Sequence, residues 1–237
     1  MSPQSQKNLA SRTKTHRASL FIVDDHPMTR FGLRELIDSE EALQVVGESD
    51  NAEDTLEKVQ KQKPDMLLVD LTLKGRSGLE LIKDLRRVMP DIDVLVFSMH
   101  EEAFYAERVL RAGARGYVMK SEGSGRLLEA IQTILEGRVF VSDTVANSFL
   151  DKMTGRQNET TSSPVDRLTD RELEVLALVG KAYESRDIAA ELNMSVKTVE
   201  AHRTSIRQKL DVKSRAELVR FAVLWMAETG AEEFPKN

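Results

Sequence analysis

Acidic side chains follow two short apolar runs of the chain, at positions where a parallel sheet would carry its chemistry. Asp24 and Asp25 come directly after the run 20–23, and Asp70 comes directly after the run 66–69. If the two runs are neighbouring strands, the three carboxylates meet at one edge of the sheet and repel one another. A divalent cation relieves such repulsion, and Mg²⁺ is preferred where a few carboxylates are completed by water and phosphate oxygens. We therefore predict a Mg²⁺ site at this edge.

A hydroxyl group and an ammonium group are expected at the same edge. Ser98 follows the apolar run 94–97, and Lys120 follows the run 116–119. Together with the acids and the cation they suit an aspartate that attacks phosphorus, because the cation and the lysine neutralise charge on the phosphoryl oxygens. Each residue alone has an ordinary alternative, since a strand-end Asp or Ser often caps a helix and a single Lys is usually solvated. The coincidence of all five favours the phosphoryl site.

Short buried strands that alternate with amphipathic helices, from about residue 19 to residue 137, must position these groups. One helix opens at Pro27, a residue suited to a first helical turn, and another carries Leu81, Leu85 and Val88 on one face. Five strands and five helices in about 120 residues fit an α/β, flavodoxin-like, doubly wound sheet of five parallel strands. The expected strands are residues 20–23, 45–48, 66–69, 94–97 and 116–119.

A second, all-α domain is expected after a polar stretch. Ser142 or Asp143 can cap a short helix, and the segment 154–166 has almost no apolar content, which is typical of a flexible linker that spans roughly 20 Å. From Leu168 the apolar residues recur at helical spacing and predict four short helices. The turn 193–195 supplies Asn for a left-handed position and Ser for an N-cap, so the second and third helices form a helix-turn-helix.

Positive charge gathers in this second domain, although the whole chain carries a net charge of −5. Seven Lys or Arg residues but only three acids lie between Ser195 and Arg220, and the helix 196–210 directs several of the basic residues outward. Such a helix can neutralise DNA phosphates and present other side chains to base edges; the alternative is a solvated basic face. No cysteine is present, which excludes disulfides and thiolate metal sites, and no apolar run approaches the length of a membrane span.

The first set of motifs resembles the receiver domain of bacterial two-component response regulators. The resemblance lies in the acidic pair 24–25, in VDLTLKGRSGLEL around Asp70, in VFSMHEE at Ser98 and in GYVMK, which ends at Lys120. It implies that Asp70 accepts a phosphoryl group from a sensor histidine kinase and that a hydroxyl and an aromatic ring act as a switch. The implied site residues are Asp24, Asp25 and Asp70 with the backbone of Leu71 or Thr72 for Mg²⁺, Lys120 for the phosphate, and Ser98 with Tyr117 for the switch.

Two residues depart from the receiver pattern. Lys74 stands four residues after the acceptor, where many receivers carry Pro, and Met99 is bulkier than the residue often found after the switch hydroxyl. Both bear on the access of phosphodonors and on the lifetime of the phosphate. His100 is expected at the surface rather than in a phosphate relay.

The stretch 168–225 resembles the DNA-binding domain of the NarL/FixJ/LuxR group of regulators. The resemblance implies that the third helix enters the major groove of double-stranded DNA and that the last helix joins two copies on paired half-sites. The expected DNA contacts are Lys197, Thr198, Glu200, Ala201, His202, Arg203, Thr204, Arg207 and Lys209, with His202 also interpretable as a packed helix residue. The expected homodimer contacts are Leu218, Phe221 and Trp225, although Trp225 could instead close the core.

The two resemblances together imply a cytoplasmic response regulator of the NarL/FixJ family. Its expected function is phosphorylation-dependent control of transcription, with no enzyme activity beyond its own phosphorylation, and its unphosphorylated receiver is expected to mask the recognition helix. Expected partners are a sensor histidine kinase, DNA, a second copy of the chain and, as a further candidate, RNA polymerase; no membrane contact is expected.

The alternatives are a haloacid-dehalogenase-type phosphatase, which needs an acid where Thr72 stands, and a receiver that only docks proteins. The expected domains are a tail 1–17, a receiver 18–137, a linker with a short helix 138–166, a LuxR-type domain 167–230 and a tail 231–237.

Overall fold

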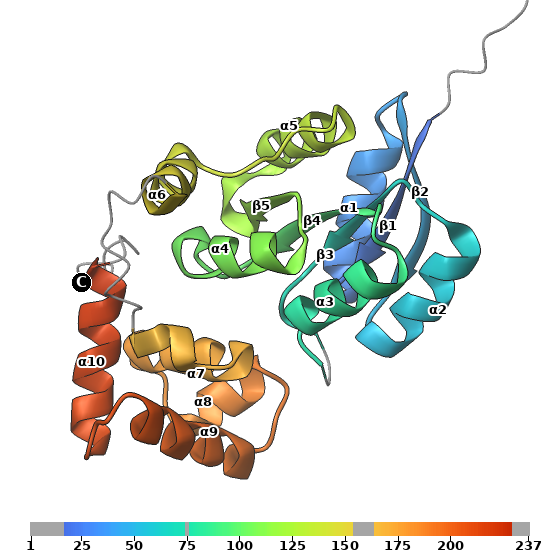
Figure 1. Cartoon of the computed structure of the whole chain (residues 1–237). Helices are drawn as coiled ribbons and strands as arrows, with labels where there is room; N and C mark the ends of the chain where they lie inside the picture. The colour runs from blue at the N-terminus through green and yellow to red at the C-terminus, as the bar shows by residue number, and fades with distance from the viewer. Residues whose placement is uncertain (1–16, 74–75, 154–163, 229–237) are drawn as a thin grey trace, which may run out of the picture.

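The computed structural model describes residues 17–73, 76–153 and 164–228, which form an α/β domain and a helical domain packed together (Figure 1). Most of the two predicted tails, residues 154–163 of the predicted linker, and Lys74 lie outside the described residues.

Five parallel strands form the sheet of the first domain, as the apolar runs predict. They pair in the order β2-β1-β3-β4-β5, which is the doubly wound order of a flavodoxin-like fold. The register places Val69 between Val23 and Val96, so the residues that follow β1 and β3 lie side by side at the carboxyl edge. The strands are β1 (Ala18–Val23), β2 (Leu43–Ser49), β3 (Met66–Val69), β4 (Asp93–Ser98) and β5 (Gly116–Met119).

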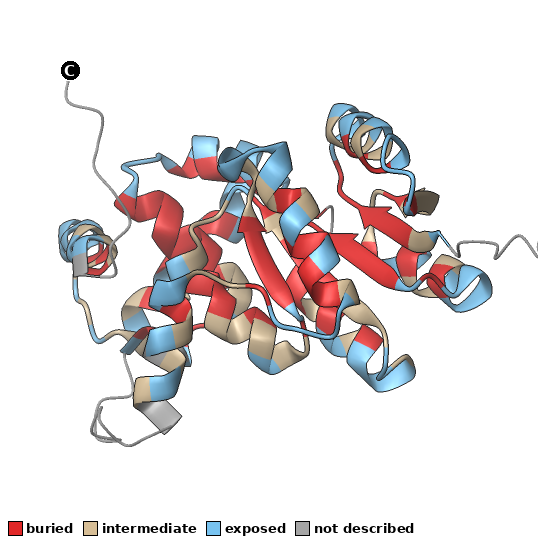
Figure 2. Cartoon of the chain, turned by 90° about the horizontal axis from the view of Figure 1, so that it is seen from above, coloured by how far each residue is buried: buried red, intermediate tan, exposed pale blue. Residues whose placement is uncertain are grey.

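Helices cover both faces of this sheet; the central strands between them are almost completely buried, whereas most of the edge strand β2 is half-buried (Figures 1 and 2). Side chains such as Ile37 and Ile131 pack against one face, and side chains such as Val59, Leu81 and Val109 pack against the other. The burial of apolar surface on both faces explains why the strands are continuous apolar runs. The first face is covered by α1 (Pro27–Asp38) and α5 (Ser124–Leu135), and the second by α2 (Ala52–Gln62), α3 (Gly78–Val88) and α4 (Glu102–Ala112).

Local sequence signals set the ends of α3. Ser77 caps the helix by accepting a hydrogen bond from the backbone N–H of Glu80, whose side chain accepts one in return from the backbone N–H of Ser77. Val88, predicted to lie on the buried face of α3, is instead 49% exposed because it is the last residue of the helix.

The second domain has the helix-turn-helix arrangement that its turn predicts. Asn193 adopts a positive φ of 50°, and Ser195 caps the following helix by accepting a hydrogen bond from the backbone N–H of Thr198. At the described end of the predicted linker a short 3₁₀ helix forms, and Val165 in it is buried. A short 3₁₀ helix, η1 (Lys120–Glu122), joins β5 to α5. The elements after α5 are α6 (Asp143–Met153), η2 (Pro164–Arg167), α7 (Asp170–Gly180), α8 (Ser185–Glu191), α9 (Val196–Lys209) and α10 (Arg215–Glu228).

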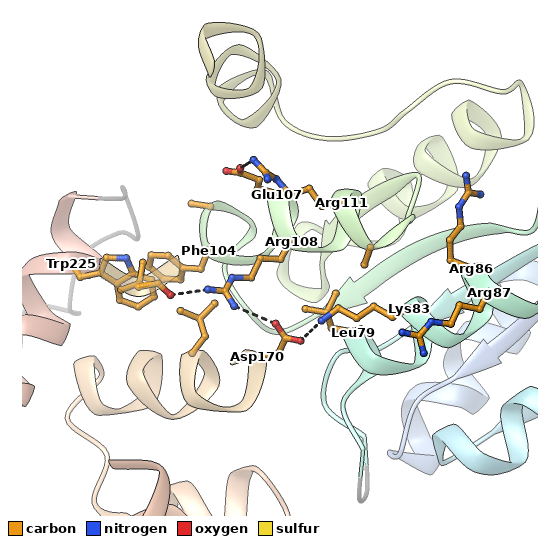
Figure 3. Close-up of a pocket in the computed structure, with 14 residues that line it drawn as sticks. Leu79, Lys83, Arg86, Arg87, Phe104, Glu107, Arg108, Arg111, Asp170 and Trp225 are labelled. Carbon is orange, nitrogen blue, oxygen red and sulfur yellow. Dashed lines mark hydrogen bonds and ion pairs between the residues drawn. The ribbon is translucent and has the colours of Figure 1, made fainter. Parts of the chain in front are cut away.

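The two domains share one continuous hydrophobic core. Phe104 of α4 stacks on Trp225 of α10, with ring centroids 4.2 Å apart. Arg108 reaches across the same interface and donates hydrogen bonds to the Val165 carbonyl at 2.8 Å and to Asp170 at 3.2 Å (Figure 3). Apolar burial and charge-assisted hydrogen bonds therefore hold the helical domain against α4.

Candidate phosphorylation site and DNA-binding surface

The structure brings predicted acids and the predicted lysine together at the carboxyl edge of the sheet. Lys120 Nζ lies 2.5 Å from Asp70 Oδ2 and 2.7 Å from Asp24 Oδ2. Asp24 and Asp70 are only 1% and 4% exposed. The strand order explains the meeting, because β1 and β3 are neighbours and β5 ends at the same edge. A buried ammonium group thus balances two buried carboxylates.

Potential metal ligands cluster around the same point. Single ligand atoms of Asp24, Asp25, His26 and Asp70 all lie within 4.8 Å of one another. Asp25 Oδ1 is buried and lies 2.7 Å from His26 Nδ1. Three buried carboxylates that meet at one point fit a hard divalent cation such as Mg²⁺. Thr72, predicted to assist, donates its backbone N–H to Asp70 Oδ1 at 3.2 Å.

Burial and charge compete in setting the protonation of this cluster. Burial raises the pKa of the Asp70 carboxyl; the charge of Lys120 opposes this rise and the charge of Asp24 adds to it. Burial alone would lower the pKa of Lys120, but the two carboxylates outweigh burial and raise that pKa. Lys120 therefore stays charged, and a further cation at the site would favour the ionised, nucleophilic form of Asp70.

The two predicted switch residues meet around the backbone of His100. Tyr117 is 1% exposed, and its hydroxyl donates a hydrogen bond to the His100 carbonyl at 2.8 Å. Ser98 is completely buried, and its Oγ accepts a long hydrogen bond of 3.4 Å from the His100 N–H. Burial raises the pKa of the Tyr117 hydroxyl well above its usual value, so this group remains a hydrogen-bond donor.

His100 itself is only partly exposed, whereas the prediction placed it at the surface. Its ring packs on Tyr105 with centroids 4.8 Å apart, and its Nε2 lies 3.0 Å from Thr72 Oγ1. Burial and nearby positive charges lower the pKa of His100 to about 4. Two of these charges, Lys181 and Arg171, belong to the docked helical domain, so the local sequence around His100 could not reveal its surroundings.

The residues predicted to contact DNA lie on α9 with different exposure. Arg203 is only 7% exposed and donates a hydrogen bond to the Tyr183 carbonyl at 3.0 Å, so the prediction that it points outward is wrong. Lys209 is partly engaged, with its Nζ 2.6 Å from Glu172. The exposed members are Lys197, Thr198, Glu200, Ala201 and Thr204, and the partly buried ones are His202, Arg207 and Lys209.

The exposure of the base-facing positions bears on the predicted masking of the recognition helix. Glu200, Ala201 and Thr204 remain exposed while the helical domain is docked on the receiver. The expectation that the receiver masks these side chains by direct contact is therefore wrong for this arrangement.

The predicted dimer contacts on α10 are largely occupied within the chain. Leu218 is 1% exposed in the core of its own domain, Phe221 is partly buried, and Trp225 packs against the receiver. The prediction that Leu218 presents a free surface is thus wrong for this arrangement, and of the two interpretations of Trp225 the structure favours a packed side chain. The large apolar side chains that α10 does expose are Val219 and Leu224.

A contact between the helix-turn-helix and the acidic cluster was not predicted from the sequence. Asn193 Nδ2 donates a hydrogen bond to Asp25 Oδ2 at 3.0 Å, across 168 positions of the chain. In the same region Arg171 Nη2 donates to the carbonyl of Leu73, in the loop that follows Asp70, at 3.2 Å. The sequence carries no separate signal for these contacts, because the positive φ of Asn193 already accounts for an Asn at the turn.

Comparisons with known proteins match both domains. Residues 20–132 match the response regulator receiver domain, and residues 166–222 match the bacterial regulatory proteins of the luxR family. The oxygen regulatory protein NreC of Staphylococcus haemolyticus is 36% identical over 208 residues, which cover 86% of this chain and 96% of the relative. NreC of Staphylococcus carnosus is 35% identical with the same coverage. None of the helices in the described ranges has the length and hydropathy that crossing a membrane requires.

Solved structures of response regulators share the architecture. A LuxR-family two-component response regulator from Aurantimonas sp. SI85-9A1 aligns with a TM-score of 0.54 and 34% identity, over 58% of this chain and 98% of the other. RcsB from Salmonella enterica serovar Typhimurium, bound to promoter rprA with the phosphomimetic BeF3−, aligns with a TM-score of 0.56 and 26% identity, over 88% and 99%. The chain therefore belongs to the NarL/FixJ family of two-component response regulators, which join a receiver domain to a LuxR-type DNA-binding domain.

Proposed function

We propose that a sensor histidine kinase phosphorylates Asp70 and that this modification controls the binding of DNA by α9. The observation that carries the proposal is that one buried ammonium group, that of Lys120, contacts both Asp70 and Asp24. The same positive charge that balances the acids before phosphorylation would pair with the phosphoryl group afterwards.

The donor set supports a single phosphoryl transfer. An ionised oxygen of Asp70 attacks phosphorus, an O–P bond forms while the P–N bond of the kinase phosphohistidine breaks, and the released imidazole takes up a proton. Mg²⁺, held by Asp24, Asp25 and Asp70, would supply positive charge to the phosphoryl oxygens. Thr72 has no carboxyl group that could serve as a general acid, so repeated turnover of the haloacid-dehalogenase type is not expected.

Phosphorylation would act on the docked arrangement of the domains. Ser98 and Tyr117 both contact the backbone of His100, and His100 packs close to cations of the helical domain. Movement of the Ser98 hydroxyl toward a phosphoryl oxygen would therefore disturb the His100 segment, whose ring lies near these cations of the helical domain. Release of the domain would also separate Trp225 from Phe104 and free that part of α10 to join a second copy.

The exposed side of α9 would bind double-stranded DNA as part of a homodimer. Lys197 and Arg207 would neutralise phosphates, whereas Glu200 and Ala201 would face base edges in the major groove. The related RcsB has been solved as dimers bound to DNA, which supports this arrangement. A kinase partner and a DNA target place the protein in the cytoplasm in this proposal, with RNA polymerase as a further candidate partner.

Labelling and footprinting test the proposal together. Purified protein is incubated with Mg²⁺ and radiolabelled acetyl phosphate, and the wild type is compared with Asp70→Asn and with Asp91→Asn, a matched change at an exposed acid. We expect the wild type and Asp91→Asn to take up label and to gain protection of promoter DNA, and Asp70→Asn to do neither. Persistent labelling of Asp70→Asn would contradict the acceptor, and footprints that ignore the phosphodonor would contradict phosphate control.

A further inference from the structure

The turn of the helix-turn-helix contacts the acidic cluster of the receiver. Asn193 lies in this turn, and its amide donates to Asp25 Oδ2 at 3.0 Å. Arg171, at the start of α7, holds the loop after Asp70 through the Leu73 carbonyl. The helical domain therefore touches two of the loops that carry the acids. In this docked arrangement Asp24, Asp25 and Asp70 are only 1%, 5% and 4% exposed.

The Asn193 amide and a metal ion would compete for Asp25, because the two groups interact with a carboxylate in different ways. An amide NH₂ group offers only hydrogens with partial positive charge, so it can satisfy a carboxylate oxygen but cannot ligate a cation. Mg²⁺ also keeps several of its waters when it binds to a few carboxylates, and these waters need room beside Asp25. In the docked arrangement the three acids have almost no exposed surface and Asn193 occupies one side of Asp25, so the waters of a bound Mg²⁺ need the space that Asn193 fills.

We propose that Asn193 is a latch that competes with Mg²⁺ for Asp25, so that metal binding and docking of the helical domain oppose each other. This inference rests on the proposed function, because it uses the same metal site. Antagonism between two binding events is reciprocal: Mg²⁺ weakens docking by the factor by which docking weakens Mg²⁺ binding. Metal entry, before any phosphoryl transfer, is then the first step that loosens the DNA-binding domain.

The single tryptophan of the chain reports on the latch directly. Trp225 is stacked on Phe104 and 8% exposed in the docked arrangement, so undocking moves its ring into water and shifts its fluorescence emission to the red. In the full-length wild type, titration with MgCl₂ should produce this red shift. Isothermal titration calorimetry on the same samples measures Mg²⁺ binding independently of the fluorescence.

Two variants at the turn change the latch while keeping its backbone conformation. Asn193→Gly removes the amide and tolerates the positive φ, and it should bind Mg²⁺ about tenfold more tightly because one charge-assisted hydrogen bond no longer opposes the metal. Asn193→Asp places a second carboxylate against Asp25, so the domain should undock without metal, and added Mg²⁺ should bridge the two acids and shift the emission to the blue. The matched control is Asp211→Gly, an exposed residue with a φ of 56° in the same domain, which should behave as the wild type.

The results of these titrations distinguish a failure of the Asn193 latch from a failure of the proposed phosphorylation site. Mg²⁺ binding by calorimetry without any change in Trp225 emission would overturn the latch, and so would a wild-type Mg²⁺ affinity in Asn193→Gly. A red shift in Asn193→Asp on adding Mg²⁺ would also overturn it, because a merely structural role of Asn193 does not reverse the sign. Absence of Mg²⁺ binding in every variant would overturn the metal site of the proposed function and the latch with it, whereas labelling of Asp70 tests the acceptor separately.

Discussion

Replacing Arg203 with Met should destabilise the helical domain without removing a DNA contact. The position of Arg203 on the recognition helix favours a phosphate contact, but its side chain is 7% exposed and its Nη2 is bound to the Tyr183 carbonyl. Met keeps the length of the aliphatic stem while it removes the guanidinium group. The variant therefore isolates the buried hydrogen bond from the packing around it.

The size of the effect follows from two opposing contributions. A hydrogen bond from a charged group contributes about 1.5–3 kcal/mol, and its loss leaves the Tyr183 carbonyl without this partner. Burial disfavours the charge of Arg203, lowering its pKa, and its Nε has no hydrogen-bond partner, so removing the guanidinium relieves part of that cost. We expect a net loss of about 1–2 kcal/mol in the free energy of unfolding.

Urea unfolding followed by Trp225 fluorescence measures this loss. With a slope of about 1 kcal/mol per molar urea, the midpoint should fall by about 1–2 M. The matched control is Arg207→Met, because Arg207 lies on the same helix and is partly exposed. This variant should keep the wild-type urea midpoint, bind DNA more weakly, and show a salt dependence of DNA binding reduced by about one charge. An unchanged midpoint for Arg203→Met, combined with a reduced salt slope, would refute the structural role of Arg203.

Three other predictions concern the site and the interface. Phe104→Ala removes an aromatic pair worth about 1 kcal/mol, so the Trp225 emission should shift to the red before any Mg²⁺ is added; an unchanged spectrum would mean that the stack does not hold the domains together. Lys120→Met leaves the buried acids without their counter-ion and should cost about 3 kcal/mol in the unfolding free energy without Mg²⁺, with Mg²⁺ restoring most of it; equal stabilisation of variant and wild type by Mg²⁺ would contradict this. Burial raises the pKa of Glu174 from 4.5 to about 7, so Glu174 stabilises docking at low pH and this contribution is lost as pH rises through 7. Burial lowers the pKa of His100 from 6.5 to about 4, so His100 stabilises docking at high pH and this contribution is lost as pH falls below 6.5. Docking of the wild type, followed by Trp225 emission, should thus change little between pH 4.5 and 6.5, while Glu174→Gln should undock as pH falls through that range; identical pH profiles would contradict the opposition.

The sheet and the helix-turn-helix could be predicted because their signals are local. A strand buried on both faces must be an apolar run, and the carboxyl ends of parallel strands share one edge, so residues as distant as Asp24, Asp70 and Lys120 could be placed together from strand positions alone. The turn was predictable for the same reason, since Asn tolerates a left-handed position and Ser is a favoured N-cap, and the two stand two residues apart.

The errors concern residues whose surroundings come from the other domain or from a distant loop. His100 is polar and follows a strand, which favours exposure, yet it is only partly exposed and its pKa is affected by Lys181 and Arg171 of the docked helical domain. Arg203 has the spacing of a DNA-contacting residue, but its side chain folds back to the carbonyl of Tyr183, a contact that helical periodicity does not describe. Trp225 was open to two interpretations because an apolar face shows that something covers it without showing what does.

The exposure of α9 in the docked arrangement limits how phosphorylation can control DNA binding. Glu200, Ala201 and Thr204 are exposed before any modification, so uncovering them cannot be the controlled step. Trp225, in contrast, is buried against Phe104 and becomes available only when the domains part. Joining two copies converts binding of the second half-site into an intramolecular event and can raise the affinity by about 10²–10⁴ without any new DNA contact. Control through release of α10 therefore accounts for a large response from a recognition helix whose base-facing side chains are already exposed in the docked arrangement.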